Sequence, residues 1–312
     1  MINKIEPLVS ICCITYNQKK IIKDAINSFL VQKTDFPIEI LIHDDASTDG
    51  TAEIVRVYEN KYPDLIDVVY QTENQYSKGK RVFYNLFNIA RGKYIALCEG
   101  DDYWTDPLKL QKQVDFLESH PECSLCCHKV IIHFGDGEFP DSVSPKFNGN
   151  RILNKKEFFI FTCSVMFRNI IPEEYYSYIS DFKVGDTPLW HYLAQFGNVA
   201  FLDQCMATYR RHKAGVFGSL SQIDQVLCMI DTREKITRKL GYQENHFNLI
   251  LYHIKLIKLH RHMENYNGMR NQIQKCYPYL KYASARQIFA VFKYSLISIF
   301  PFIDKLYKLF KT

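Results

Sequence analysis

The chain has 312 residues, of which 47% are hydrophobic and 23% charged, an ordinary balance for a folded globular protein with a sizeable core. No apolar run reaches the roughly 20 residues of a membrane-spanning helix, and residues 1–7 lack the apolar segment of a secretion signal. The net charge of +5 is unevenly divided, because residues 210–312 hold 18 Lys and Arg against 6 Asp and Glu and the remainder is acidic.

Strand and helix signals alternate along the first part of the chain. Residues 8–14 form a nearly continuous apolar run, which is typical of a strand buried on both faces of a parallel sheet. Apolar residues then recur at helical spacing over residues 21–30, and residues 38–42 predict a second strand. The polar turn that follows predicts the start of a second helix, with Thr48 or Asp49 as its cap.

The same alternation continues to residue 98. Residues 68–70 predict a short third strand, residues 83–90 a helix that ends near Gly92, and residues 94–98 a fourth strand. Such repetition implies right-handed crossovers and an α/β fold with a mostly parallel central sheet flanked by helices. Ligands of these sheets bind at the carboxyl ends of the strands, so we expect a site at the turns after the first, second and fourth strands.

The fourth strand ends in three carboxylates, Glu99, Asp101 and Asp102. Carboxylates at the exit of a buried strand repel one another unless a cation lies between them. Oxygen ligands of this kind suit Mg²⁺ or Mn²⁺, with substrate phosphates completing the coordination shell. The residues therefore indicate a metal–nucleotide site, and the alternative is an acidic turn that leads into the helix opened by Asp106 and Pro107.

The segment 123–128 contains a Cys-x₂-Cys spacing and so raises a zinc hypothesis. No second cysteine pair follows at a suitable distance, and the apolar residues around it favour a core strand over residues 123–134. Reduced, buried thiols are expected in this chain, because many cysteines lie in apolar, strand-like settings without a secretion signal. These cysteines are Cys12, Cys13, Cys98, Cys163 and Cys205.

The regular alternation weakens after residue 107. Residues 108–119 predict an amphipathic helix, and residues 135–150 predict an exposed loop because they are polar and rich in Gly, Pro and Ser. The apolar segment 158–167 is expected to return to the core. Residues 186–195 predict a helix with Pro188 in its first turn.

The pattern beyond about residue 220 is helical and basic. We expect two parts, a catalytic domain over residues 1–215 and a helical region over residues 216–312. A basic tail on an acidic body indicates an anionic partner such as a membrane surface, or else a solvated helical face; no nucleic-acid motif accompanies it. The terminal segment 294–310 resembles an interfacial amphipathic helix, with packing on the parent domain as the alternative.

Taken together, these fragments resemble the inverting, nucleotide-sugar-dependent glycosyltransferases of family 2, which have the GT-A fold, a Rossmann-like sheet flanked by helices. The resemblance covers residues 7–215 and depends on five fragments in the family's order. The fragments are residues 9–17, 39–51, 90–102, 164–168 and 185–186.

The resemblance implies a binding role for several residues of the nucleotide-sugar site. Tyr16 matches the aromatic residue that stacks on the nucleotide base, with strand-end packing as the alternative. Asp45 matches the carboxylate that accepts a hydrogen bond from a uracil-type N–H, and Asp44 binds beside it or caps the following turn. Lys78 and Arg81 lie where the family often places a basic residue near the diphosphate, although Tyr84-Asn85 replaces the family's usual Arg-Asn pair; a solvated surface charge is the alternative.

The metal motif departs from the family's Asp-x-Asp-Asp, because Glu99 stands at its first position. The resemblance implies that Asp101 or Asp102 binds Mn²⁺ or Mg²⁺, while the other carboxylates contact ribose or orient the ligand. His212 falls where related enzymes supply a further metal or diphosphate contact, and a surface histidine is the alternative.

Asp186 matches the family's general base, which takes the proton of the acceptor hydroxyl as this attacks the anomeric carbon. Its alternative is a helix cap, because an anion is stabilised at a helix amino terminus.

We therefore expect an inverting sugar transferase that uses a nucleotide-sugar donor, most simply a UDP-sugar, and a glycan or lipid-linked acceptor. We expect it in the cytoplasm, peripheral to the inner face of the cell membrane. A nucleotidyltransferase and a non-catalytic nucleotide- or glycan-binding module remain the alternatives. A nucleotidyltransferase usually has a Gly-rich basic loop after its first strand. This chain has Thr15-Tyr-Asn-Gln18 at that place, which argues against this alternative.

Overall fold

A computed structural model describes residues 6–80, 82–135, 140–212, 215, 218–243 and 245–299 of the chain. The chain divides into two compact units. The larger unit is formed by Met1–Asp181 and Gly185–His212, and the smaller by Phe182–Val184 and Lys213–Thr312.

The larger unit is built on one sheet, which has ten strands within the described residues. Its order is β3-β2-β1-β4-β9-β6-β10-β5, with β7 paired to β6 and β8 paired to β10. The strands are β1 (Val9–Thr15), β2 (Ile38–Asp44), β3 (Ile66–Tyr70), β4 (Tyr94–Leu97), β5 (Tyr103–Trp104), β6 (Cys123–Phe134), β7 (Ser142–Ser144), β8 (Arg151–Leu153), β9 (Met166–Arg168) and β10 (Asn198–Arg211).

Parallel pairing extends across the four strands β3, β2, β1 and β4, and it returns where β6 pairs with β10. The short strand β9 is antiparallel to both β4 and β6 and so joins the two parallel parts. The expected α/β fold with a mostly parallel central sheet is confirmed, in the form of a mixed sheet. The central strands β1 and β4 are buried almost throughout, which explains their continuous apolar sequences.

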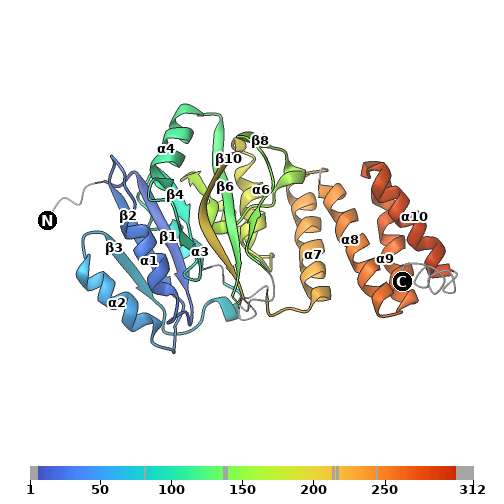
Figure 1. Cartoon of the computed structure of the whole chain (residues 1–312), viewed down its shortest axis with the longest axis horizontal. Helices are drawn as coiled ribbons and strands as arrows, with labels where there is room; N and C mark the ends of the chain where they lie inside the picture. The colour runs from blue at the N-terminus through green and yellow to red at the C-terminus, as the bar shows by residue number, and fades with distance from the viewer. Residues whose placement is uncertain are drawn as a thin grey trace. The chain divides into compact units, whose positions relative to one another are not determined.

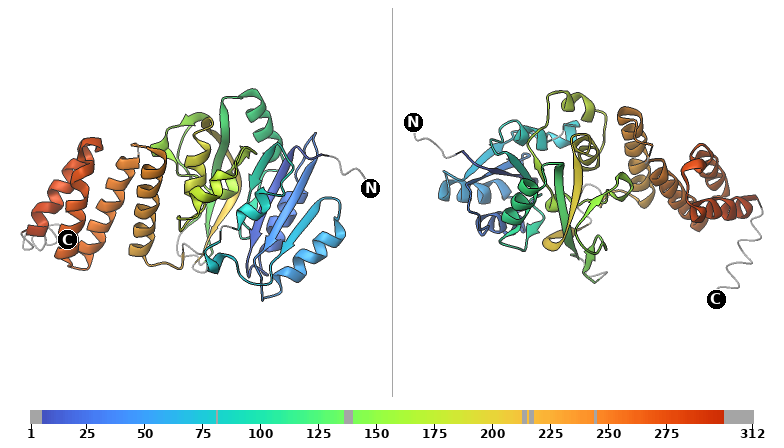
Figure 2. Two further views of the ribbon diagram at one scale, coloured as in Figure 1. Left: turned by 180° about the vertical axis from the view of Figure 1, so that it is seen from behind. Right: turned by 90° about the horizontal axis from the view of Figure 1, so that it is seen from above.

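Helices cover both faces of the sheet (Figures 1 and 2). The helices α1 and α2 pack against each other, and α3 contacts β1 and β2 from the opposite face, as right-handed crossovers require. Helix α4 packs against β6. The helices of this unit are α1 (Ile22–Leu30), α2 (Thr51–Lys61), α3 (Phe83–Phe87), α4 (Lys109–Ser119), α5 (Glu174–Ile179) and α6 (Asp186–Leu193), with the 3₁₀ turns η1 (Tyr76–Lys78), η2 (Lys155–Glu157) and η3 (Thr162–Ser164).

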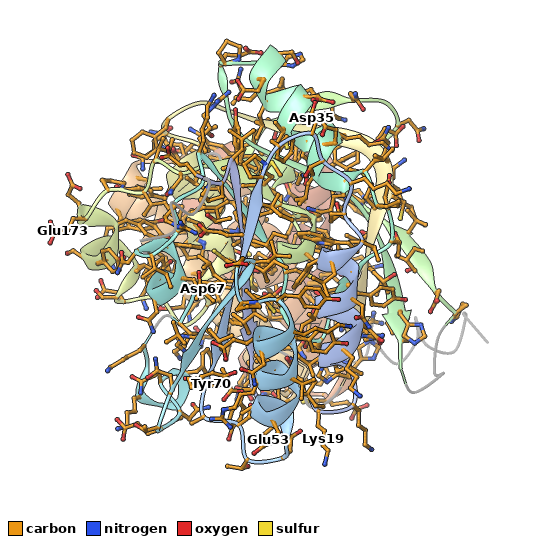
Figure 3. The ribbon with its side chains drawn as sticks, turned by 90° about the vertical axis from the view of Figure 1, so that its left-hand side faces the viewer. Lys19, Asp35, Glu53, Asp67, Tyr70 and Glu173 are labelled. Atoms are coloured by element: carbon orange, nitrogen blue, oxygen red, sulfur yellow. The ribbon has the colours of Figure 1, made fainter. Side chains whose placement is uncertain are left out.

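The strand order reverses between β1 and β4. The chain proceeds from β1 to β2 and β3 on one side and then returns through α3 to β4 on the other side of β1. Figure 3 shows Lys19, Glu53 and Tyr70 at the edge where β1–β3 end, and Asp35 at the opposite edge. In open α/β sheets the reversal point, at the carboxyl edge, is the usual place for a ligand.

A buried carboxylate ties the other end of these strands together. Glu39 is 2% exposed and accepts hydrogen bonds from the Ser10 hydroxyl at 2.6 Å and from the Arg91 guanidinium at 2.6 and 2.8 Å. The Ser10 hydroxyl in turn accepts the Gly92 N–H at 2.8 Å. Because the buried charge is paired and hydrogen-bonded, this network fixes the register of β1, β2 and the turn before β4.

The smaller unit is helical. Its helices α8, α9 and α10 enclose one apolar core that includes Ile250, Met269, Ile273, Val291 and Tyr294, and α7 packs against α8. They are α7 (Gln222–Leu240), α8 (Asn245–His262), α9 (Tyr266–Cys276), the 3₁₀ turn η4 (Tyr277–Tyr282) and α10 (Ala285–Ile299). None of the described helices has both the length and the apolar sequence needed to cross a membrane. Of the segment 294–310, residues 300–310 lie outside the described residues.

Two local expectations need correction. Helix α2 begins at Thr51 and its N-cap is Gly50, so neither Thr48 nor Asp49 is the cap residue; the Asp49 carboxylate instead accepts the Thr51 N–H at 3.0 Å. Cys205 is exposed, because the pairing of β10 with β6 is irregular around it. The other nine cysteines are buried free thiols, and the predicted core strand over residues 123–134 is confirmed as β6.

Candidate functional site

The turns after β1 and β2 are joined by side chains. The Asn17 N–H donates to the Ser47 hydroxyl at 2.9 Å, and the Thr48 N–H donates to the Asn17 side-chain oxygen at 2.8 Å. Asn17 and Ala46 both have left-handed backbone conformations, with φ of 51° and 62°. Non-glycine residues in this conformation are uncommon, and they concentrate where a surrounding structure enforces them, often at functional sites.

Tyr16 begins the turn after β1 and leaves its ring at the surface. Its side chain is 46% exposed, although the strand before it is buried. Nearly half of the residue is therefore open to a planar ligand, and the remainder is covered by the protein.

Asp44 is the last residue of β2 and Asp45 follows it; both are buried, yet their contacts differ. The two carboxylate oxygens of Asp45 accept the N–H groups of Gln75 at 2.7 Å and Tyr76 at 3.0 Å. One oxygen of Asp44 accepts the Ser47 N–H at 3.1 Å, and the other is buried without a hydrogen-bond partner. Asp45 thus holds the loop before η1, whereas Asp44 caps a turn and retains a free acceptor.

The turn after β4 brings its acidic residues against the end of β10. The Oδ2 atom of Asp101 lies 3.0 Å from Nε2 of His212, and Oδ1 of Asp102 accepts the Arg210 N–H at 2.8 Å. The Oε2 atom of Glu99 is buried without a partner. The structure therefore brings together Glu99, Asp101, Asp102 and His212.

The charges in this turn act strongly on one another. Burial and then the neighbouring Asp101 raise the pKa of Glu99 to about 8. Burial, followed by Asp101 and Glu99, raises the pKa of Asp102 well above its usual range. The hydrogen bond to Asp101 raises the pKa of His212. Crowded carboxylates of this kind favour binding of a cation.

Arg210 is a residue of this site that the sequence did not single out. Its guanidinium donates to the Asp101 carbonyl oxygen at 3.1 Å and to the Asp24 carboxylate of α1 at 2.5 Å. Arg210 thus fixes the acidic turn to the helix that follows β1. The only available signal was its place two residues before His212, because the partners of its side chain come from distant segments.

Asp186 is the first residue of α6 and is exposed at its amino terminus. Its carboxylate accepts the N–H of Thr187 at 2.6 Å. The charge of Asp186 also contributes to the raised pKa of Glu99, which places the two carboxylates within electrostatic range of each other.

Of the two predicted basic residues, the structure describes only Lys78, which is paired with another residue than these carboxylates. Lys78, on η1, forms an ion pair with Glu73, and both side chains are about half exposed. Arg81 lies outside the described residues. The link between Lys78 and the site is indirect, through the loop that Asp45 holds.

Gly100 explains part of the unusual Glu99-Gly-Asp-Asp sequence. Its N–H donates to the Ile14 carbonyl oxygen at 2.9 Å, which brings the turn against the end of β1. A Cβ at this position would overlap the Gln18 side-chain oxygen and lie 2.7 Å from Cδ1 of Ile22. The acidic turn can approach β1 this closely only because residue 100 has no side chain.

Gly100→Ala is therefore expected to lower the free energy of unfolding by about 1–3 kcal/mol, as overpacking does. Denaturant unfolding measures the effect. Gly135→Ala is the matched control, because no atom of the described residues other than its chain neighbours lies within 4 Å of the Cβ it would add. Equal stability of the two variants would contradict the close approach.

The smaller unit contains a separate recess of about 270 Å³, lined by residues of α7, α8, α9 and η4. His253 is one of the lining residues. Its Nδ1 atom lies 3.0 Å from the side-chain oxygen of Gln272, and its Nε2 atom is buried without a hydrogen-bond partner. No member of the acidic cluster lines this recess.

The family model described as Glycosyl transferase family 2 matches residues 10–175. An uncharacterised protein of Mycobacterium tuberculosis (H37Rv) is 39% identical over 225 residues, which cover 68% of this chain and 61% of that protein. The UDP-Glc:alpha-D-GlcNAc-diphosphoundecaprenol beta-1,3-glucosyltransferase WfaP of Escherichia coli is 28% identical over 277 residues, which cover 85% of this chain and 99% of WfaP.

Two solved structures are similar in fold. S. aureus TarS 1–349 in complex with UDP-GlcNAc matches with a TM-score of 0.57 and 18% identity, over 85% of this chain and 80% of that one. The mannosyltransferase PcManGT from Pyrobaculum calidifontis, in complex with GDP-Man and Mn²⁺, matches with a TM-score of 0.55 and 14% identity, over 95% of this chain and 88% of that one. The GT-A fold expected from the sequence is confirmed.

Proposed function

The chain belongs to glycosyl transferase family 2, and we propose that it is an inverting glycosyltransferase that moves a sugar from a nucleoside diphosphate sugar to a hydroxyl group of a glycan or lipid-linked acceptor. The observation that carries this proposal is the convergence of Glu99, Asp101, Asp102 and His212 beside the end of β1, where the strand order reverses, with the charge of Asp186 acting on Glu99. A donor diphosphate, a cation and an acceptor hydroxyl each have a chemically suitable partner there.

The base of the donor is assigned to the turns after β1 and β2. The exposed Tyr16 ring stacks on it, and Asp45 accepts the N–H of a uracil. Oδ1 of Asp45 accepts the Gln75 N–H and lies 3.4 Å from Nε2 of His43, so Oδ2, which accepts the Tyr76 N–H, is the oxygen assigned to the base. The free oxygen of Asp44 offers a second contact to the nucleoside. A UDP-sugar is the preferred donor, in line with the UDP ligands named for WfaP and TarS.

A divalent cation fits the donor set of this turn. Within the described residues, no three His, Cys, Asp or Glu side chains already form a metal-binding group. Asp101 and His212 would hold the ion, and the donor diphosphate would complete its coordination, as Mg²⁺ and Mn²⁺ sites commonly allow. The bound ion would neutralise the charge that develops on the leaving nucleoside diphosphate. Glu99 is assigned to the ribose, through its unpartnered oxygen.

The transfer is a single displacement in which Asp186 is the general base. The acceptor hydroxyl gives its proton to the Asp186 carboxylate while its oxygen forms a bond to the anomeric carbon. The bond from that carbon to the diphosphate oxygen breaks on the opposite face, and the electron pair leaves with the diphosphate. Configuration at the anomeric carbon is inverted. The exposed position of Asp186 leaves room for an acceptor to approach.

We place this reaction on the cytoplasmic side of the membrane, where a lipid-linked acceptor would be presented. The diphosphoundecaprenol acceptor named for WfaP supports an acceptor of this class.

Purified full-length protein should release UDP from at least one UDP-sugar when Mn²⁺ or Mg²⁺ is present, and a chelator should abolish the release. The assay compares UDP-glucose, UDP-galactose, UDP-N-acetylglucosamine and GDP-mannose, with nuclear magnetic resonance of the product to establish inversion. Failure to bind or turn over any donor with metal present would refute the proposal. Pyrophosphate release from a nucleoside triphosphate and a sugar phosphate would instead identify a nucleotidyltransferase, and binding without turnover would identify a binding module.

A further inference from the structure

Helix α10 has two apolar faces, and only one of them is used by the core. Val291, Tyr294 and Ile297 are buried against the other helices of the smaller unit. The opposite face exposes side chains at helical spacing along the whole element. These are Ile288 (46% exposed), Phe289 (67%), Phe292 (62%), Leu296 (40%) and Ile299 (56%). We call these five residues the outer face of α10.

Single exposed apolar residues are common on protein surfaces, but a continuous stripe along a helix is not. Two phenylalanines that are more than 60% exposed lie in the first half of this stripe. A stripe of this composition indicates that something covers it in the functional protein.

The excess of basic residues in this part of the sequence indicates an anionic partner. Helical spacing places Arg286 and Lys293 along one border of the stripe. Residues 245–299 as a whole carry eight Lys and Arg against one acidic residue, Glu264. The sequence that follows, residues 300–312, adds three lysines and one aspartate.

We propose that the outer face of α10 docks on the anionic surface of a lipid bilayer. Phenylalanine, leucine and isoleucine would enter the region between headgroups and acyl chains, while the basic residues pair with lipid phosphates. A second copy of this chain is a poorer occupant, because the two basic surfaces would repel each other. A nucleic acid would use the charge but leave the aliphatic side chains exposed. The inference depends on the proposed function in one respect only: docking would bring the site to a lipid-linked acceptor.

The test uses full-length protein and co-sedimentation with vesicles, without nucleotide sugar. Wild type should bind vesicles of phosphatidylcholine containing phosphatidylglycerol and bind phosphatidylcholine alone far more weakly. Phe289→Ser with Phe292→Ser should weaken binding by roughly tenfold or more. Arg286→Gln with Lys293→Gln should remove most of the preference for anionic vesicles. The matched control is Val57→Ser with Leu251→Ser, which removes two exposed apolar residues (65% and 44%) outside the outer face and should bind like wild type.

Circular dichroism measures the folding of each variant, and light scattering measures its oligomeric state. Absence of vesicle binding by folded wild type would overturn the inference, as would equal binding by the Phe variant and the control. A change from oligomer to monomer in the Phe variant, with vesicle binding unchanged, would also overturn it and assign the face to a second copy. Since no donor is present, these results are independent of whether sugar transfer is found.

Discussion

Asp186→Asn is expected to reduce sugar transfer by a factor of roughly 100 to 10,000, the usual contribution of a general base. Asparagine has almost the same shape but cannot accept the proton of the acceptor hydroxyl. The donor binds through Tyr16, the end of β2 and the acidic turn, so the affinity for UDP should be nearly unchanged. Initial rates with acceptor and calorimetric titration with UDP measure the two quantities.

The competing role for Asp186 is stabilisation of α6, since its carboxylate accepts the Thr187 N–H in the first turn. The matched control is Glu174→Gln, which makes the same carboxylate-to-amide change at an exposed position in the first turn of α5. Both variants should lose less than about 1 kcal/mol of stability. A structural cap would instead appear as a large loss of stability in Asp186→Asn, with activity falling only in proportion to the unfolded protein.

The first half of the sheet could be predicted from the sequence because its strands are locally encoded. Buried parallel strands appear as continuous apolar runs, and the runs at residues 8–14 and 38–42 correspond to β1 and β2 within two residues at each end. The carboxylates at the strand ends could be identified from the sequence as well, because they stand where the apolar runs stop. Their convergence followed from the rule that parallel strands share a carboxyl edge.

The second half of the sheet could not be predicted in the same way. Strand β10 supplies Arg210 and is followed by His212, but polar residues around Cys205 and irregular pairing between Leu202 and Ala207 break its pattern. Strand β5 has only two residues and exists because it pairs with β10. The roles of Arg210 and Gly100 depend on contacts between segments far apart in the sequence, which no local pattern encodes.

Asp101→Asn is expected to weaken the activation by Mn²⁺ by at least roughly 10- to 100-fold, the loss that follows when even an outer partner of a metal ligand is removed. Asp101 presents a partly exposed carboxylate 3.0 Å from His212, so both side chains can turn their donor atoms toward an ion. Asp102 is 1% exposed, and one of its oxygens accepts the Arg210 N–H. We therefore propose that Asp101 binds the cation and that Asp102 holds the end of β10 in position through the Arg210 N–H.

Asp102→Asn makes the same chemical change one residue along the chain and so serves as the matched comparison. It should lower the free energy of unfolding, because the buried acceptor of the Arg210 N–H is altered, yet leave the Mn²⁺ concentration for half-maximal rate unchanged. The rate as a function of Mn²⁺ concentration, together with Mn²⁺ binding measured by electron paramagnetic resonance in the presence of UDP, distinguishes the two residues. If only Asp102→Asn shifted the dependence of the rate on Mn²⁺ concentration, Asp102 and not Asp101 would be the metal ligand. His212→Gln should lie between the two variants, since it removes one ligand and leaves the carboxylate that carries the charge.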